Sequence, residues 1–297
     1  MPRRCDIWRV GIAPAPIERI AAEGTVHEVR WLAEEPSFRF LADPFGLWRD
    51  GRLHLFAEAY DYRTRHGVVD CLTFDADFAV IARRTVLREP WHLSYPYVFE
   101  ADGETWMLPE AARSGALTLY RAAPFPDRWE PASRLELDVA PIDATPMRHE
   151  GRWWLFYSGG RDRAARMGTL HVAWAERLEG PWHPLAGNPI RRDMAGARPG
   201  GTPFIAEGQL CLPVQDCSHT YGGAIRILRF THLSPDRAET ELGPPIGAPA
   251  DTAYREGMHT LARCGPVTLI DVKKIDRTGR GWLIDLARRF RRPRGPA

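Results

Sequence analysis

A segment of sixteen residues recurs five times between positions 43 and 272, and each copy carries a glycine at its ninth position. An acidic residue precedes that glycine in the first four copies, as tight hairpin turns prefer, whereas Cys264 precedes it in the fifth. The copies start 52, 48, 57 and 57 residues apart, and this repeat predicts five hairpins of common design. The copies are DPFGLWRDGRLHLFAE from Asp43, YPYVFEADGETWMLPE from Tyr95, DATPMRHEGRWWLFYS from Asp143, GGTPFIAEGQLCLPVQ from Gly200 and GMHTLARCGPVTLIDV from Gly257.

The run that follows each glycine is apolar on both faces, so the predicted strand must be covered on both sides. Outer strands are visible after copies two and three, over 115–131 and 168–185. Sheets standing side by side around an axis meet this requirement, because each blade covers its neighbours. We therefore expect an all-β fold, a five-bladed β-propeller of four-stranded antiparallel blades over residues 1–281, followed by a basic tail over 282–297. A β-sandwich of similar strand count is the alternative.

The composition narrows the class of protein. Apolar and charged fractions of 44% and 26% are ordinary for a globular chain, and a net charge of +2 gives no reason to expect nucleic acid as a partner. The N-terminus lacks the apolar core of a signal peptide, and the five cysteines are odd in number and scattered, so we expect reduced thiols and a cytoplasmic location. Cys211 and Cys217 lack the partners of a metal motif, and we predict no metal and no cofactor.

Hairpin geometry brings the first and sixteenth positions of each copy to the same end of its sheet, so five blades gather five such pairs at one mouth of the central channel. The first positions are Asp43, Tyr95, Asp143, Gly200 and Gly257, and the sixteenth positions are Glu58, Glu110, Ser158, Gln215 and Val272. Asp216, His259 and Lys273 adjoin this rim in the sequence.

Carboxylates dominate the predicted rim. An aspartate at a strand start can simply cap a loop, and this holds for any one of them. As a set, however, crowded like charges are unfavourable unless binding or chemistry uses them. Reactions at an anomeric carbon need two opposed carboxylates, and we predict that Asp43, Glu110 and Asp143 are catalytic, with Glu58 binding substrate.

Two families resemble this chain. ADPF at 42–45, the Asp143 start of copy three and GPW at 180–182 resemble the five-bladed family 43 and family 32 glycoside hydrolases. That resemblance implies a base or nucleophile at Asp43 and a modulating carboxylate at Asp143. A closer likeness covers most of the chain. It is carried by FLADPF, LSYPYVFEADGETWMLPE, GRWWLFYS, ARPGGTPF and LPVQDCSHTYGGAI, which resemble the propeller domain at the N-terminus of plant glucosamine inositolphosphorylceramide transferases.

The chain departs from the hydrolases at Gly200-Gly201, where that resemblance implies the acid glutamate. Either Glu110 or Asp216 supplies the proton, or the leaving group is a phosphate or nucleotide diphosphate that needs cations instead. Lysine occurs only twice, next to the fifth copy, which suggests a need for ammonium groups there. We therefore predict that three cations bind substrate: Arg198, Lys273 and Lys274.

Further polar and aromatic side chains near the rim suit sugar hydroxyls and sugar ring faces. The predicted binding residues of this kind are Tyr95, Gln215, Asp216, His219, Tyr221 and His259.

The tail GWLIDLARRFRRPRGPA has the pattern of a short amphipathic helix. Trp282, Leu283, Leu286 and Phe290 share one face, with arginines nearby, and we expect a peripheral membrane contact. A disordered basic end is the alternative.

The leading functional prediction is a glycosyltransferase of cell-envelope glycan assembly. It would use a phosphate-activated or nucleotide-linked sugar donor and a glycan acceptor, in the cytoplasm and in contact with the membrane. The alternatives are a family-43-like glycoside hydrolase, with Asp43 as base and Glu110 as acid, and a non-catalytic glycan-binding propeller.

Overall fold

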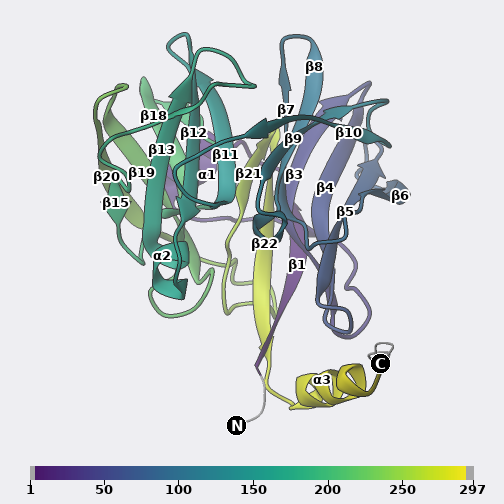
Figure 1. The fold of residues 1–297 in the computed structure, drawn as a ribbon. Coiled ribbons are helices and arrows are strands. Elements are labelled where there is room, and N and C mark those ends of the chain that lie inside the picture. Colours follow the sequence, from purple (N-terminus) through teal and green to yellow (C-terminus); the bar gives the residue numbers. More distant parts are fainter. Residues whose placement is uncertain (1–3, 292–297) are drawn as a thin grey trace, which may run out of the picture.

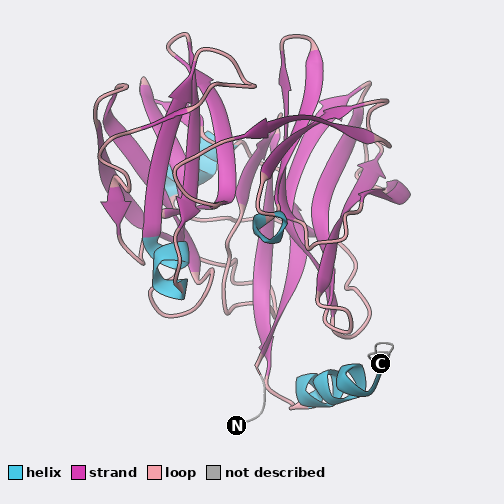
Figure 2. Cartoon of the chain, viewed as in Figure 1, coloured by secondary structure: helices cyan, strands magenta, loops and turns pink. Residues whose placement is uncertain are grey.

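The computed structural model describes residues 4–291. The chain forms five antiparallel sheets (Figure 1), and strands make up nearly all of its regular structure (Figure 2). The prediction of a five-bladed β-propeller is confirmed, and the two largest sheets each add one short strand to the basic set of four.

Blades one to three follow the chain in order, from the inner strand outward. Blade one contains β3 (Arg39–Arg49), β4 (Arg52–Asp61), β5 (His66–Phe74) and β6 (Val80–Leu87). Blade two contains β7 (Ser94–Ala101), β8 (Glu104–Glu110), β9 (Leu117–Ala122) and β10 (Trp129–Leu135). Blade three contains β11 (Pro141–His149), β12 (Arg152–Gly159), β13 (Thr169–Ala175), β14 (His183–Pro184) and the short β15 (Arg191–Arg192).

In blade four the inner strand is divided in two at Gly200-Gly201. Its strands are β16 (Arg198–Pro199), β17 (Phe204–Ala206), β18 (Gln209–Asp216), β19 (Ala224–Leu233) and β20 (Ala238–Ile246). Within residues 4–291, four short helical segments lie outside the sheets: α1 (Ile17–Glu23), the 3₁₀ turn η1 (Ala112–Ser114), α2 (Arg163–Gly168) and α3 (Arg280–Arg291). Among the described residues, no helix has both the length and the apolar character that crossing a bilayer requires.

Blade five is completed by the opposite end of the chain. Its inner strands β21 (Leu261–Cys264) and β22 (Val267–Asp276) pair with β1 (Cys5–Ala13), which in turn pairs with β2 (Arg30–Trp31). β1 and β22 stay in register over nine residue pairs, from Cys5 opposite Asp276 to Ala13 opposite Thr268. The first and last parts of the described chain therefore close the ring, a feature that the internal repeat did not predict.

The hairpin turns explain the repeated glycine. In blade one the two turn residues, Asp50 and Gly51, have φ of 52° and 70°, and the next three repeats also have an acidic residue and a glycine at positive φ. This is the twist-matched turn that favours glycine at its second position.

The fifth turn differs, and the difference corrects the predicted register. Here Cys264 pairs with Val267, so the turn residues are Gly265 (φ 57°) and Pro266. Proline cannot adopt positive φ, so the glycine must come first and the hairpin moves by one residue. Seven residues after the turn, where blade one has Glu58, blade five has Lys273. The assignment of Val272 to that position was wrong.

At the rim, the first positions of three blades share an unusual backbone. Asp43, Tyr95 and Asp143 have φ of 50°, 45° and 50°, and in each case the strand pairing shifts register at that point. A bulge with a non-glycine residue in the left-handed region re-aims a side chain and is favoured only where the surroundings hold it. The repeat therefore supplies three equivalent side chains at the inner end of its blades.

Candidate active site

The hairpin ends meet at one cavity of about 680 Å³. It takes residues from blades one, two, four and five, from α2 and from the start of β1. Its lining includes seven of the predicted site residues, namely Asp43, Glu58, Glu110, Arg198, His219, Tyr221 and His259. The sequence thus identified much of the lining of one concave site.

Asp43 lies at the floor of this cavity and is 5% exposed. Its Oδ2 accepts a hydrogen bond from the backbone N–H of Tyr95 at 3.1 Å, and its Oδ1 lies 3.5 Å from His259 Nε2. Burial raises the pKa of Asp43 to about 6, against the opposing effect of His259. At neutral pH Asp43 is therefore mainly ionised and has the proton affinity of a useful base.

Asp271, on β22, holds this corner together and was missed by the sequence analysis. Its Oδ1 accepts the backbone N–H groups of His259 and Thr260 at 3.1 and 3.0 Å, and its Oδ2 accepts that of Asp43 at 2.9 Å. His259 Nδ1 lies 2.8 Å from Asp271 Oδ1, which directs Nε2 toward Asp43. Burial lowers the pKa of His259, but the two carboxylates outweigh it and leave this pKa above its ordinary value.

The indole of Trp8, on β1, covers the same corner. It stacks on His259 with ring centroids 3.6 Å apart and an interplanar angle of 12°. Trp8 and Asp6 line the cavity only because β1 returns to close blade five. No pattern within the first thirteen residues indicates that role, so the sequence analysis missed both.

Asp143 and Arg198 form a buried ion pair between blades three and four. Arg198 Nε and Nη2 donate to the two carboxylate oxygens at 2.6 and 3.2 Å, and Gln215 Nε2 donates to Oδ2 at 2.8 Å. The guanidinium carbon also lies 5.1 Å from the ring centroid of Tyr221. These donors hold the Asp143 carboxylate in a fixed orientation, as a modulating residue requires.

Glu110 lies beside this ion pair. Its Oε2 is 3.9 Å from Arg198 Nη2 and accepts a hydrogen bond from Ser94 Oγ at 3.4 Å. Burial, followed by the negative charge of Asp143, raises the pKa of Glu110 to about 8 although Arg198 opposes the shift. At neutral pH Glu110 is mainly protonated and can donate a proton.

Glu58 lies on the blade-one side of the cavity and is 6% exposed. Burial and the neighbouring carboxylate of Asp43 raise its pKa well above the ordinary value. His92 Nε2 lies 3.4 Å from Glu58 Oε1, and burial lowers the pKa of His92 to about 4. Both shifts favour the neutral forms of the imidazole and the carboxyl group, which suit hydrogen bonds with sugar hydroxyls.

Gly200 and Gly201 leave no room for an acid at the start of blade four. A Cβ on Gly201 (φ 152°) would lie 1.9 Å from the carbonyl oxygen of Leu261. A Cβ on Gly200 would lie 2.8 Å from the carbonyl oxygen of His259. The departure from the hydrolase pattern is thus built into the packing between blades four and five.

The cavity lining does not include the predicted catalytic Asp143 or five predicted binding residues, namely Tyr95, Gln215, Asp216, Lys273 and Lys274. Tyr95 is fully buried, and its hydroxyl accepts the N–H of Gly201 at 2.9 Å, so it supports the floor. Asp216 pairs with Arg226 at 3.0 Å. Lys274 lies apart from Lys273, 3.4 Å from Glu34.

Lys273 is also outside the cavity lining, beneath Tyr221. Its ammonium donates to the carbonyl oxygen of Tyr221 and to Thr220 Oγ1, the latter at 3.1 Å, and it lies 3.5 Å from Asp6. The side chain is fully buried, and burial lowers its pKa. Lys273 holds the loop that carries Tyr221 against β1.

Within residues 4–291, ligand-type atoms of Asp43, His259 and Asp271 lie within 4.8 Å of one another. Asp271 already accepts three backbone N–H groups and faces the imidazole, so these residues form a hydrogen-bonded array and we assign no metal to them. The five cysteines are all buried, and none of them forms a disulfide within residues 4–291.

Comparison with known proteins places this arrangement in a wider context. Residues 28–252 match the family described as "Glucosamine inositolphosphorylceramide transferase 1, N-terminal". Glucosamine inositolphosphorylceramide transferase 1 of Oryza sativa subsp. indica is 36% identical over 203 residues, which cover 66% of this chain and 27% of that protein. This chain therefore spans about a quarter of the length of the curated relatives that it matches.

Solved structures share the fold at low sequence identity. The catalytic domain of the Coprinopsis cinerea GH62 α-L-arabinofuranosidase has a TM-score of 0.59 at 12% identity, covering 90% of this chain and 97% of that one. A thermostable family-43 glycoside hydrolase has a TM-score of 0.54 at 16% identity, covering 73% and 82%. The resemblance to the transferase N-terminal domain is confirmed for the family, and the resemblance to family 43 glycoside hydrolases is confirmed for the fold.

Proposed function

This chain belongs to the family of the glucosamine inositolphosphorylceramide transferase 1 N-terminal domain, and on that premise we propose that it is a carbohydrate-active enzyme that transfers a glycosyl group. The relatives are named as transferases, which favours transfer over hydrolysis for this chain. The proposal concerns the propeller itself, with its own base and acid.

One observation carries the proposal. Asp43 and Glu110 come from different blades and line one cavity, and their pKa values are raised to different levels, about 6 and about 8. Near pH 7 one group is mainly ionised and the other mainly protonated. Two carboxyl groups whose pKa values differ in this way are the usual arrangement for acid–base chemistry at an anomeric carbon.

In the proposed reaction, Asp43 accepts the proton of the acceptor hydroxyl as its oxygen bonds to the anomeric carbon. The bond from that carbon to the leaving oxygen breaks, and Glu110 gives its proton to this oxygen, so one proton is taken up and one released. The Asp143–Arg198 ion pair holds both of its charged groups in fixed positions beside Glu110. Glu58, His92 and Tyr221 face the same space and would hold sugar hydroxyls or a ring face.

We further propose a phosphate-activated sugar as donor. Lys273 does not line the cavity, and Arg198 is buried against Asp143, so the cations for the phosphate would be Arg163 and Arg4. Both line the cavity and are exposed, and Arg4 also contacts Asp6 and Thr220. Guanidinium groups suit phosphate oxygens because they present paired donors. We also propose that the enzyme acts in the cytoplasm, in the assembly of cell-envelope glycans.

A glycoside hydrolase is the second candidate, and the protonated Glu110 is the observation in its favour. The missing glutamate of blade four was the sequence-based argument against hydrolysis, and Glu110 would supply that proton from blade two.

Incubation of the purified chain with a panel of sugar nucleotides and glycan acceptors, with product analysis by mass spectrometry, tests the proposal. Asp43→Asn and Glu110→Gln should each lower turnover by about 10²-fold or more. Asp127→Asn, which removes a surface carboxylate paired with Arg84, is the matched control and should leave turnover unchanged. Release of free sugar without transfer would support the hydrolase. Binding without turnover in the unaltered chain would support the glycan-binding propeller and refute the enzyme.

A further inference from the structure

Helix α3 presents the most exposed large apolar side chains of the described residues. Trp282 and Leu283 are 58% and 57% exposed, more than any other large hydrophobic residue there. They are adjacent in the chain and about 100° apart around the helix, and together we call them the apolar patch. Exposed tryptophan beside an exposed aliphatic residue is typical of a surface that meets a partner or a membrane.

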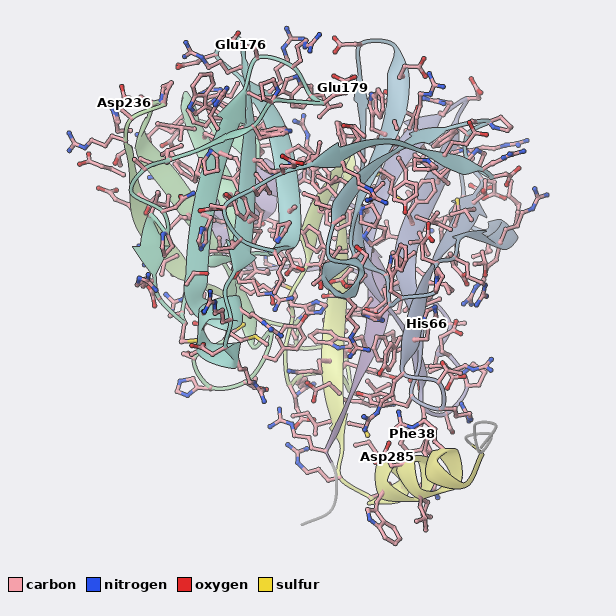
Figure 3. All side chains as sticks on the ribbon, viewed as in Figure 1. Phe38, His66, Glu176, Glu179, Asp236 and Asp285 are labelled. Carbon is pink, nitrogen blue, oxygen red and sulfur yellow. The ribbon has the colours of Figure 1, made fainter. Side chains whose placement is uncertain are left out.

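The helix is attached at the cavity end of the propeller. Arg65 Nη2 donates to both carboxylate oxygens of Asp285 at 3.1 Å. Arg65 lies in the turn between β4 and β5, and Tyr62 in the same turn lines the cavity. Figure 1 shows α3 at the end of the molecule opposite the β7–β8 turn, and Figure 3 shows Asp285 at the same end as Phe38.

The anchoring contact leaves the apolar patch free. Asp285 lies about 160° around the helix from Leu283 and about 60° from Trp282, so the ion pair with Arg65 is opposite Leu283 and next to Trp282. Because Trp282 and Leu283 remain more than half exposed, the helix is fixed to the propeller with its apolar patch directed outward.

The sequence of this segment is strongly basic. From 280 to 294 it contains six arginines and one acidic residue, Asp285, which is already paired with Arg65 and Arg288. The side chains of Arg289, Phe290 and Arg291, and residues 292–297, lie outside the described part. Apolar anchors beside clustered arginines match an anionic lipid surface, which attracts the cations and accepts the apolar groups at its headgroup boundary.

We propose that α3 docks the propeller onto an anionic bilayer, with Trp282 and Leu283 inserted among the headgroups and the cavity end turned toward the lipid. The helix lies on the surface, since its twelve residues are too few to span a bilayer. The inference does not depend on the chemistry at Asp43 and Glu110, so either can fail without the other. It gives the cavity access to an acceptor held at a membrane surface.

Vesicle flotation with the full chain tests the proposal. We expect binding to vesicles of phosphatidylcholine mixed with phosphatidylglycerol, and at least about tenfold weaker binding to phosphatidylcholine alone. The double variant Trp282→Ser/Leu283→Ser should weaken binding about tenfold or more, because both apolar anchors are lost. Raising the salt from about 0.1 to about 0.5 M should also weaken binding, since it screens the arginines.

The matched control is Val80→Ser/Ile81→Ser, which removes an adjacent apolar pair, 53% and 48% exposed, from β6. It should bind vesicles as the unaltered chain does. Equal loss in both double variants, or no binding of the unaltered chain to anionic vesicles, would overturn the proposal. A dimer that becomes a monomer in Trp282→Ser/Leu283→Ser, without vesicle binding by the unaltered chain, would instead assign the patch to a second copy of the chain.

Discussion

Replacing Arg198 with methionine should lower the free energy of unfolding by about 3 kcal/mol, because it leaves a buried carboxylate without its cation. The side chains of Arg198 and Asp143 are only 8% and 3% exposed, and Arg198 Nε lies 2.6 Å from Asp143 Oδ2. Methionine fills a similar space, so the loss reports on charge more than on packing. Gln215 still donates one hydrogen bond to Asp143, which places the loss at the lower end of the range for broken buried pairs.

The measurement is urea unfolding near pH 7, followed by circular dichroism and tryptophan fluorescence. Arg84→Met is the control, since Arg84 also pairs with a carboxylate, Asp127, but these two side chains are 64% and 46% exposed. Exposed pairs contribute at most about 1 kcal/mol, so this control should change stability little.

A second substitution separates charge from volume. If the unpaired Asp143 is the cause, Arg198→Met/Asp143→Asn should be more stable than Arg198→Met by about 1 kcal/mol or more. Equal losses in Arg198→Met and Arg84→Met, or a double variant no more stable than Arg198→Met, would refute the reasoning.

Three further predictions concern the same site. Activity should follow a bell-shaped pH profile, falling below about 6 as Asp43 is protonated and above about 8 as Glu110 ionises, and a profile without these limbs would contradict the roles. Folding raises the pKa of Glu110 from 4.5 to about 8, so its contribution to stability is full below pH 4.5 and is lost as pH rises through about 8. Glu110→Gln should therefore flatten the fall in stability between these values in urea titrations, and an unchanged pH dependence would count against the shift. Gly201→Ala should destabilise the fold by about 2 kcal/mol or more, because its Cβ would lie 1.9 Å from the carbonyl oxygen of Leu261. In Gly103→Ala the new Cβ meets no atom within 4 Å and only the φ of 79° is unfavourable, so this variant should lose about 1 kcal/mol. Equal melting temperatures for these two variants would show that blade four tolerates a side chain there.

The sequence predicted the blades because each repeat carries its own turn chemistry. An acidic residue and a glycine at positive φ fix the hairpin in repeats one to four, and the rim residues follow by counting. The same counting failed by one residue in repeat five, where Pro266 forces a different turn. Asp271 was missed for this reason, since its inward position is visible only in the corrected register.

Contacts between distant segments could not be predicted from local pattern. Trp8 reaches His259 because β1 closes the last blade, and no repeat links these two parts of the chain. Arg198 was predicted as a phosphate ligand, yet its partner Asp143 lies across the junction of blades three and four. The two lysines stand next to each other in the chain but on opposite faces of β22, one buried and one at the surface.

The central claim is that carboxyl groups from blades one and two act on the same anomeric carbon. A crystal structure of the Glu110→Gln variant with a bound sugar donor tests it most directly. The account predicts that the anomeric carbon lies between Asp43 and Gln at position 110, with the two groups about 5 to about 9.5 Å apart. A donor bound with its anomeric carbon away from both groups, or outside the cavity, would contradict it.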